Sequence, residues 1–242
     1  MIYSVLFDLV GTLVEESSSV LNTKKGYYEI QVKAIHYSLE KDGISVDWSP
    51  FMKRYKQVRV KQKASSKQTL REYDMCKRVS DTLRFFNHDL PSTSNIIRQA
   101  VDAYMIPYIN SLQIRHPTYD LLGTLNAKYK LGLVTNFPYS PGAYRVLDQF
   151  ALRPFFKAVV VSGEVGWKKP SQQIFEIALS KLSFKPQEAI FVGDDYEADI
   201  VGAKKAGIKT IFLCKESVDS EKADVTIESL VELPSAIKRL SQ

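Results

Sequence analysis

Polar side chains capable of chemistry follow several short apolar runs in this sequence, at the points where strands would end. They are Asp8 after VLF, Thr135 and Asn136 after LGLV, and Asp194 and Asp195 after AIFVG. Parallel strands place their carboxyl ends at one edge of a sheet, so we expect these side chains to lie close together. Lys169, in the loop GWKKP ahead of a predicted helix, adds an ammonium group to the set.

The chemistry of this set is that of a phosphoryl-binding site. Carboxylate oxygens are the ligands that Mg²⁺ prefers, and the ion keeps several waters when they hold it. The metal ion, the Lys169 ammonium and the Thr135 hydroxyl would then bind a phosphoryl group, because cations screen the repulsion between two anions. Each residue alone also fits a turn or the first turn of a helix, but the agreement of separate strand ends favours a site.

The rest of the sequence divides into two segments with different patterns of apolar residues. The first segment is helical. From Val20 to about Ser111, apolar residues recur at spacings of three and four, as in Phe51, Tyr55 and Val58. This spacing predicts helices throughout the segment. Breaks that suggest about four helices are expected at Asp42-Gly43, Ser49-Pro50, Ser65-Ser66 and Leu90-Pro91.

From His116 onward, predicted strands and helices alternate. The runs LGLVTN, AVVVS, AIFVGDD and TIFLC are typical of strands. Helices are expected at 119–129, at 143–150, over SQQIFEIALSKL, over ADIVGAKKAG and at 229–240. This alternation predicts an α/β fold, a doubly wound parallel sheet whose first strand is VLF. We therefore expect an α/β core domain of residues 1–14 and 115–242, with an all-helical domain of residues 15–114 inserted after the first strand.

Composition excludes several classes of protein. The apolar fraction of 45% is ordinary for a globular protein. The sequence contains no run of eighteen apolar residues, so we expect no membrane-spanning helix. The first residues lack the basic and apolar segments of a secretion signal. Cys76 and Cys214 lie far apart without metal-ligand spacing. A reduced, cytoplasmic protein is the expectation.

The net charge of +6 is concentrated in one segment. Between Pro50 and His88 there are eleven Lys or Arg residues and three acidic ones. Such a segment is usually a solvated helix face, but it also attracts anions. It lacks a base-reading motif, so we expect a small anionic substrate and neither nucleic acid nor a membrane as partner.

Four motifs in this chain resemble those of the haloacid dehalogenase-type (HAD) hydrolases. FDLVGTL resembles the first motif, LVTN the second, KKP the third and GDDYEAD the fourth, and the helix GAKKAG follows. The motifs occur in the family's order. The resemblance implies a Rossmann-like core with a helical cap between the first two motifs. It also implies a Mg²⁺-dependent phosphatase that acts on a small phosphorylated metabolite.

The resemblance also implies a role for each site residue. Asp8 would be the nucleophile that accepts the phosphoryl group as an aspartyl-phosphate, and Lys169 would neutralise charge between them. Thr135, Asn136 and Lys169 would hold the transferring group. Mg²⁺ would be ligated by Asp8, Asp194 and the main-chain carbonyl of Val10. Asp195 and Asp199 would complete or orient that metal shell.

Val10 departs from the family pattern, because phosphatases of the family carry a second aspartate at this position. That aspartate protonates the leaving group and activates water, and such acid–base assistance contributes about 10²–10⁴-fold. Three interpretations stay open. The chain is a phosphatase whose acid–base group comes from the cap (His36, Lys63, Tyr73 or His88), a metal-independent dehalogenase or phosphonate-cleaving relative, or a non-catalytic phosphate-ligand binding or regulatory protein.

Overall fold

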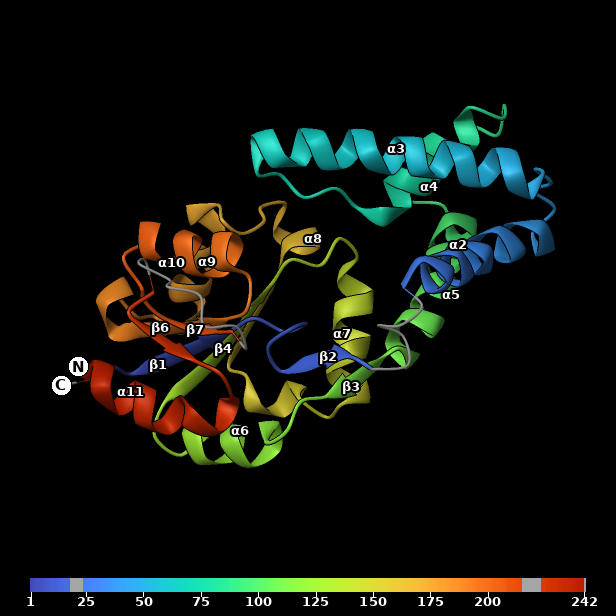
Figure 1. Ribbon diagram of the computed structural model, residues 1–242. Coiled ribbons are helices and arrows are strands. Elements are labelled where there is room, and N and C mark those ends of the chain that lie inside the picture. Colours follow the sequence, from blue (N-terminus) through green and yellow to red (C-terminus); the bar gives the residue numbers. More distant parts are fainter. Residues whose placement is uncertain (18–23, 215–222, 242) are drawn as a thin grey trace.

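The computed structural model describes residues 1–17, 24–214 and 223–241. Its centre is a six-stranded sheet with the order β5-β4-β1-β6-β7-β8, in which every neighbouring pair is parallel (Figure 1). The strands are β1 (Ser4–Phe7), β4 (Lys130–Thr135), β5 (Ala158–Val161), β6 (Ala189–Gly193), β7 (Lys209–Leu213) and β8 (Val225–Ile227). The predicted doubly wound α/β fold is confirmed, and β8 is a strand that the sequence analysis did not predict.

Both faces of the sheet are covered, which is why its strands are apolar at consecutive positions. Val5 and Phe7 pack in one hydrophobic cluster, while Leu6 packs in another on the opposite face. The first cluster includes residues of α6 (Thr118–Asn126), α7 (Ser140–Gln149) and α11 (Leu233–Ser241). The second includes residues of α9 (Gln172–Leu182) and α10 (Gly202–Lys205). Figure 1 shows α9 and α10 on one side of the strands and α6 and α11 on the other.

The predicted helical segment contains four long helices among the described residues, as expected. They are α2 (Lys24–Lys41), α3 (Trp48–Thr69), α4 (Met75–Arg84) and α5 (Asn95–Asn110). Two predicted breaks are wrong, because α3 runs through both Ser49-Pro50 and Ser65-Ser66. Proline in the first turn lacks only an N–H that would have no helical partner there, so Pro50 does not end the helix. The first part of the predicted helical segment, residues 20–23, lies outside the described residues.

A short antiparallel ribbon joins the helical segment to the sheet domain. It pairs β2 (Val14–Glu16) with β3 (Leu112–Ile114), with Val14 opposite Ile114. The sequence analysis predicted neither strand, since three residues are too few to show an alternating pattern. The ribbon lies close to the predicted boundaries, and the division into a core of 1–14 and 115–242 and a cap of 15–114 remains a prediction.

The connection between α3 and α4 also contacts the sheet domain, beside the loop that carries Lys169. The Glu72 N–H donates to the Gly166 carbonyl at 3.1 Å, and the Lys168 N–H donates to the Leu70 carbonyl at 3.0 Å. The Arg71 guanidinium lies 3.5 Å from the centre of the Trp167 ring, a cation–π contact. The helical segment therefore helps to position the loop ahead of Lys169.

The predicted helix over ADIVGAKKAG forms, but in two parts. The π-helix η3 (Tyr196–Val201) begins after Asp195 and continues into α10. π-helical turns inside helices occur frequently at functional sites.

Among the helices of the described ranges, none has the length and apolar character needed to cross a bilayer.

Candidate active site

Asp8 lies at the centre of the sheet edge, one residue after β1 ends. Its side chain faces a buried environment, and the residue is 7% exposed. The Asp8 N–H donates to the Val192 carbonyl of β6 at 3.0 Å, which fixes the backbone beside the neighbouring strand. The lone aspartate after the first strand is thus held among the carboxyl ends of parallel strands, as predicted.

Lys169 reaches this carboxylate from the loop before α9. Its Nζ lies 2.6 Å from Oδ1 of Asp8 and 2.6 Å from Oδ1 of Asp199, while the residue is only 2% exposed. Buried charges of this kind occur in pairs or groups, because an isolated one would lose its solvation without compensation. Lys169 is therefore the lysine that pairs with these carboxylates.

Three carboxylates gather around this lysine. Asp8, Asp194 and Asp199 each offer an oxygen, and these oxygens all lie within 4.8 Å of one another. The turn after β1 shapes the place of Asp194, because the Thr12 hydroxyl donates to its Oδ1 at 2.8 Å. Gly11 has a φ of 104°, and a Cβ at this position would overlap the Asp194 carboxylate. The Gly-Thr pair that follows Asp8 therefore admits Asp194 and holds it.

The three carboxylates have only the Lys169 ammonium to balance their negative charge. Burial raises the pKa of Asp8, the Lys169 ammonium opposes this effect, and the Asp194 charge adds to it. Burial likewise raises the pKa of Asp194, and it raises that of Asp199 to about 6 despite Lys169. Burial alone would lower the pKa of Lys169, but the charges of Asp199 and Asp8 outweigh burial and raise it above its usual value.

The donor set fits a hard divalent cation. Three carboxylates face one ammonium, so two negative charges would be in excess when all are ionised. A cation such as Mg²⁺ prefers oxygen ligands and removes that excess. Asp8, Asp194 and Asp199 are the residues that would hold it, and the predicted role of the Val10 carbonyl remains a prediction.

Asp195 lies outside this cluster, although the resemblance implied that it would complete or orient the metal shell. Its carboxylate accepts a hydrogen bond from the Ala198 N–H at 2.9 Å and caps η3. Its own N–H donates to Oδ2 of Asp199 at 3.0 Å. Asp195 thus contributes by its backbone to the orientation of Asp199, while its side chain begins the helix.

Asn136 is engaged differently from its predicted role. Its Oδ1 accepts from the Lys169 N–H at 2.7 Å, and its Nδ2 donates to the Lys169 carbonyl at 3.0 Å. This two-point clamp fixes the backbone of Lys169 and uses the amide that was expected to bind phosphate.

Thr135 is buried at the end of β4, on the strand beside β1. Its role as a phosphate ligand remains a prediction.

A small cavity of about 180 Å³ opens between the helical segment and the loop after β4. Its lining includes Arg59 and Lys63 of α3, Arg78 of α4, Tyr104 and Tyr108 of α5, and Asn136. Burial raises the pKa of Tyr108, and the charges of Glu16 and Asp8 raise it further. We call this space the inner cavity.

The inner cavity is strongly cationic. Arg59, Lys63 and Arg78 form no ion pair with any carboxylate of residues 1–17, 24–214 and 223–241. Burial lowers the pKa of Lys63, and the charges of Arg59 and Arg78 lower it further. Three cations that repel one another in a confined space favour an anionic guest.

Of the four proposed acid–base residues, the structure brings only Lys63 to this cavity. The His36 Nε2 lies 2.6 Å from the Val46 carbonyl, and its ring packs edge-on against Trp48 and Phe51. The Tyr73 hydroxyl is hydrogen-bonded to that of Ser65 at 2.6 Å. His88 belongs to the connection after α4. The side chains of His36 and Tyr73 thus have structural partners, and none of these three residues lines the inner cavity.

Sequence reasoning missed most of the inner cavity. Arg59 and Arg78 belong to the basic segment, and Tyr104 and Tyr108 belong to the predicted helices. None of the four was singled out as a site residue. The charge excess between Pro50 and His88 and the choice of Lys63 as an acid–base candidate pointed to this segment, but neither indicated that Arg59 and Arg78 would line the cavity.

Comparisons with known proteins identify the family of the chain. The family model of the haloacid dehalogenase-like hydrolases matches residues 4–207. The glyceraldehyde 3-phosphate phosphatase of Methanocaldococcus jannaschii is 28% identical over the full length of both chains. The chain belongs to the haloacid dehalogenase-like hydrolase family, and it is a hydrolase of that family.

Solved structures show the same fold over almost the whole chain. The magnesium-bound HAD-hydrolase YfnB from Bacillus subtilis has a TM-score of 0.63 at 21% identity, covering 98% of this chain and 99% of that one. The 2-haloacid dehalogenase from Pseudomonas syringae pv. Tomato DC3000 has a TM-score of 0.71 at 20% identity, covering 99% of each chain. At these identities the likeness concerns the fold alone, and both a phosphatase and a dehalogenase site are compatible with it.

Proposed function

We propose that this protein is a Mg²⁺-dependent phosphatase that hydrolyses a small phosphorylated metabolite through an aspartyl-phosphate at Asp8. The observation that carries the proposal is the buried contact of Lys169 with both Asp8 and Asp199, beside Asp194. A metal-independent dehalogenase has no need of three converging carboxylates. The full-length relation to a glyceraldehyde 3-phosphate phosphatase supports the same reaction class.

The proposed reaction has two displacements at phosphorus. In the first, a carboxylate oxygen of Asp8 forms a bond to phosphorus while the ester P–O bond breaks, and the alcohol oxygen leaves with the bonding electrons. In the second, the oxygen of a water molecule forms a bond to phosphorus while the bond between phosphorus and the Asp8 oxygen breaks, and the bonding electrons return to the Asp8 carboxylate. The water gives up its proton to the solvent, which also protonates the departed alcohol oxygen, and inorganic phosphate leaves. Lys169 stays protonated throughout, because the carboxylates hold its pKa high, and it stabilises the charge on the phosphoryl oxygens. Mg²⁺, when bound, supplies further positive charge to the phosphoryl group.

The inner cavity is the place for the leaving group. It adjoins the site through Asn136, which lines the cavity and whose side chain holds the backbone of Lys169. Its volume suits a metabolite of few atoms. Arg59, Lys63 and Arg78, which have no carboxylate partner in the described part of the chain, favour a leaving group that carries its own acidic group.

The proposal is tested with matched phosphate esters that differ only in a carboxylate on the alcohol part. We expect phosphate release that requires Mg²⁺, with the larger kcat/KM for the carboxylate-bearing ester. In Arg78→Gln this preference should shrink by about tenfold, since one charge-assisted contact is lost. Halide release from haloacids without metal, and no phosphate release, would refute the proposal.

Mg²⁺ binding has its own prediction. Asp194→Asn keeps the shape of the side chain and an oxygen for the Thr12 hydroxyl, but removes a negative ligand. We expect Mg²⁺ affinity, measured by calorimetry, to fall by at least about tenfold. The matched control is Asp195→Asn, which should keep its affinity because its carboxylate caps η3. Equal losses in the two variants would show that the assignment of ligands is wrong.

The presence of valine at position 10 leads to a prediction about which phosphate esters the protein cleaves faster. It is half-buried against the apolar cluster and cannot donate a proton to a leaving alkoxide. The protein should therefore cleave aryl or acyl phosphates, whose leaving groups are stable anions, faster than alkyl phosphates. Val10→Asp should raise kcat on the alkyl ester by about 10²-fold and on the aryl ester by less. If the wild type cleaves both esters equally fast, another group supplies the proton.

A further inference from the structure

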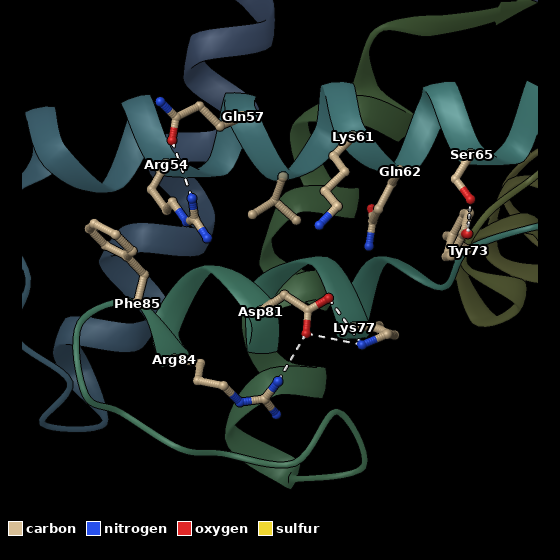
Figure 2. Close-up of a pocket in the computed structure, with 11 residues that line it drawn as sticks. Arg54, Gln57, Lys61, Gln62, Ser65, Tyr73, Lys77, Asp81, Arg84 and Phe85 are labelled. Carbon is tan, nitrogen blue, oxygen red and sulfur yellow. Dashed lines mark hydrogen bonds and ion pairs between the residues drawn. The ribbon is translucent and has the colours of Figure 1, made fainter.

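A second and larger cavity lies on the helical segment, apart from the catalytic carboxylates. It is a cleft of about 670 Å³ between α3 and α4, and we call it the α3–α4 cleft. Figure 2 shows Lys61 and Gln62 pointing from α3 towards α4, with Lys77 and Asp81 opposite. The residues of α3 that line the inner cavity, Arg59 and Lys63, do not line the cleft.

The α3–α4 cleft is rich in positive charge. Arg54, Lys61, Lys77 and Arg84 line it, against one acid, Asp81. Asp81 already contacts both Lys77, at 3.0 Å, and Arg84, at 3.4 Å. Lys61 has neither an ion pair nor a hydrogen bond within the part of the chain that the structure describes. The excess of three positive charges suits a small polyanion.

Two buried donors in the cleft have no hydrogen-bond partner among residues 1–17, 24–214 and 223–241. Nε2 of Gln62 and Nε of Arg54 are both shielded from solvent and make no hydrogen bond, and Gln62 as a whole is only 7% exposed. A buried donor without an acceptor is unfavourable, and native structures normally supply one. Since these groups are donors and the surrounding charges are positive, an acceptor that carries negative charge would complement both.

Gln62 also connects the cleft to the inner cavity. Its Oε1 accepts a hydrogen bond from Nε of Arg78 at 2.9 Å, and Arg78 lines the inner cavity. The N–H of Arg78 can only donate, so it fixes which end of the amide is oxygen and leaves Nε2 for the cleft. An anion that accepts from Nε2 holds the amide in place and, through Oε1, the guanidinium of Arg78.

We propose that the α3–α4 cleft binds a small anion with two or more phosphate groups and that this anion, through Gln62, orients Arg78 for substrate binding. The second half rests on the proposed function of the inner cavity, and the first half does not. The exposed ring of Phe85, which stacks under the Arg54 guanidinium at 4.5 Å, gives a nucleoside polyphosphate a surface for its base.

Binding is tested on the full chain by calorimetry with tripolyphosphate, ATP and adenosine. We expect tripolyphosphate to bind and ATP to bind at least as tightly. The double variant Lys61→Gln/Lys77→Gln should weaken both by about tenfold or more. The matched control Lys56→Gln/Lys67→Gln removes two exposed lysines of α3 that do not line the cleft, and it should bind as the wild type does. Equal binding by both double variants, or binding of adenosine alone, would overturn the proposal.

The coupling is tested by the KM of a carboxylate-bearing phosphate ester at constant free Mg²⁺. Tripolyphosphate should lower KM in the wild type by about fivefold and leave it unchanged in Lys61→Gln/Lys77→Gln, whose basal KM stays normal. A rise of KM instead would place the anion at the catalytic site and refute the coupling. Binding without hydrolysis of any ester would refute the phosphatase proposal, whereas hydrolysis without tripolyphosphate binding would refute the cleft.

Discussion

Replacing Asp8 by asparagine should reduce phosphatase turnover on the order of 10⁴–10⁶-fold, because an amide is a far weaker nucleophile than a carboxylate. The substitution keeps the size of the side chain and an oxygen for the Lys169 ammonium, which lies 2.6 Å from Oδ1 in the wild type. It also removes one of three mutually repelling acids from a buried site. We therefore expect the variant to fold with at least normal stability and to bind the substrate without cleaving it.

The measurement is single-turnover phosphate release, with thermal unfolding as the check on folding. Asp120→Asn is the matched control, since Asp120 is an exposed aspartate of α6. This control should keep wild-type turnover. An Asp8→Asn variant that keeps wild-type turnover would place the nucleophile elsewhere and remove the basis of the mechanism.

Replacing Lys169 by methionine should have the second largest effect, on stability as well as on activity. Methionine fills similar space but leaves Asp8 and Asp199 without their cation in a buried site. Breaking a buried ion pair by removing one partner costs about 3–5 kcal/mol in the free energy of unfolding. Turnover should also fall by about 10²–10³-fold, since a positive group next to the transferring phosphoryl is lost.

The loss of stability should depend on pH in a definite direction. Without Lys169, the pKa values of Asp8 and Asp199 in the folded state rise further above those of the unfolded chain. The folded state then binds more protons than the unfolded state, so stability falls as pH rises from about 4 upward. Urea unfolding at several pH values measures this, with Lys168→Met as the control. A deficit that is independent of pH, or equal in both variants, would contradict the account of the buried cluster.

The sheet and the acids at its edge were predictable because each signal is local. An apolar run that ends in Asp8 or Asp194 indicates both a buried strand and a polar group at its carboxyl end. Parallel pairing then brings these ends together without further information. Lys169 was predictable from the KKP sequence, and the structure explains the choice of that lysine by its complete burial.

The roles of Asn136 and Asp195 were harder to predict, because both residues follow strands yet use their side chains on the backbone. Asn136 clamps Lys169, which is 33 residues further along the chain, and only the packing of two loops sets that distance. Asp195 caps η3, a local role that its position before a helix also allowed. A strand-end position thus indicates proximity to the site, but does not decide which atom a side chain contacts.

The helical segment shows the same limit on a larger scale. Its spacing predicted helices, but not which residues of α3 face the core. Arg59 and Lys63 line one cavity while Lys61 lines another, although they are neighbours in sequence. Successive residues of a helix point in different directions, so the faces are assigned only when the packing partners are known.

The central claim, an aspartyl-phosphate at Asp8, is tested most directly by mass spectrometry of the protein quenched in acid during turnover of an aryl phosphate. Val10 cannot activate water, so breakdown of the intermediate should be slow and the intermediate should accumulate. We predict that the wild type gains the mass of one phosphoryl group, located on the peptide that contains Asp8, and that Asp8→Asn gains none. Phosphate release without any adduct, or an adduct on another residue, would contradict the account.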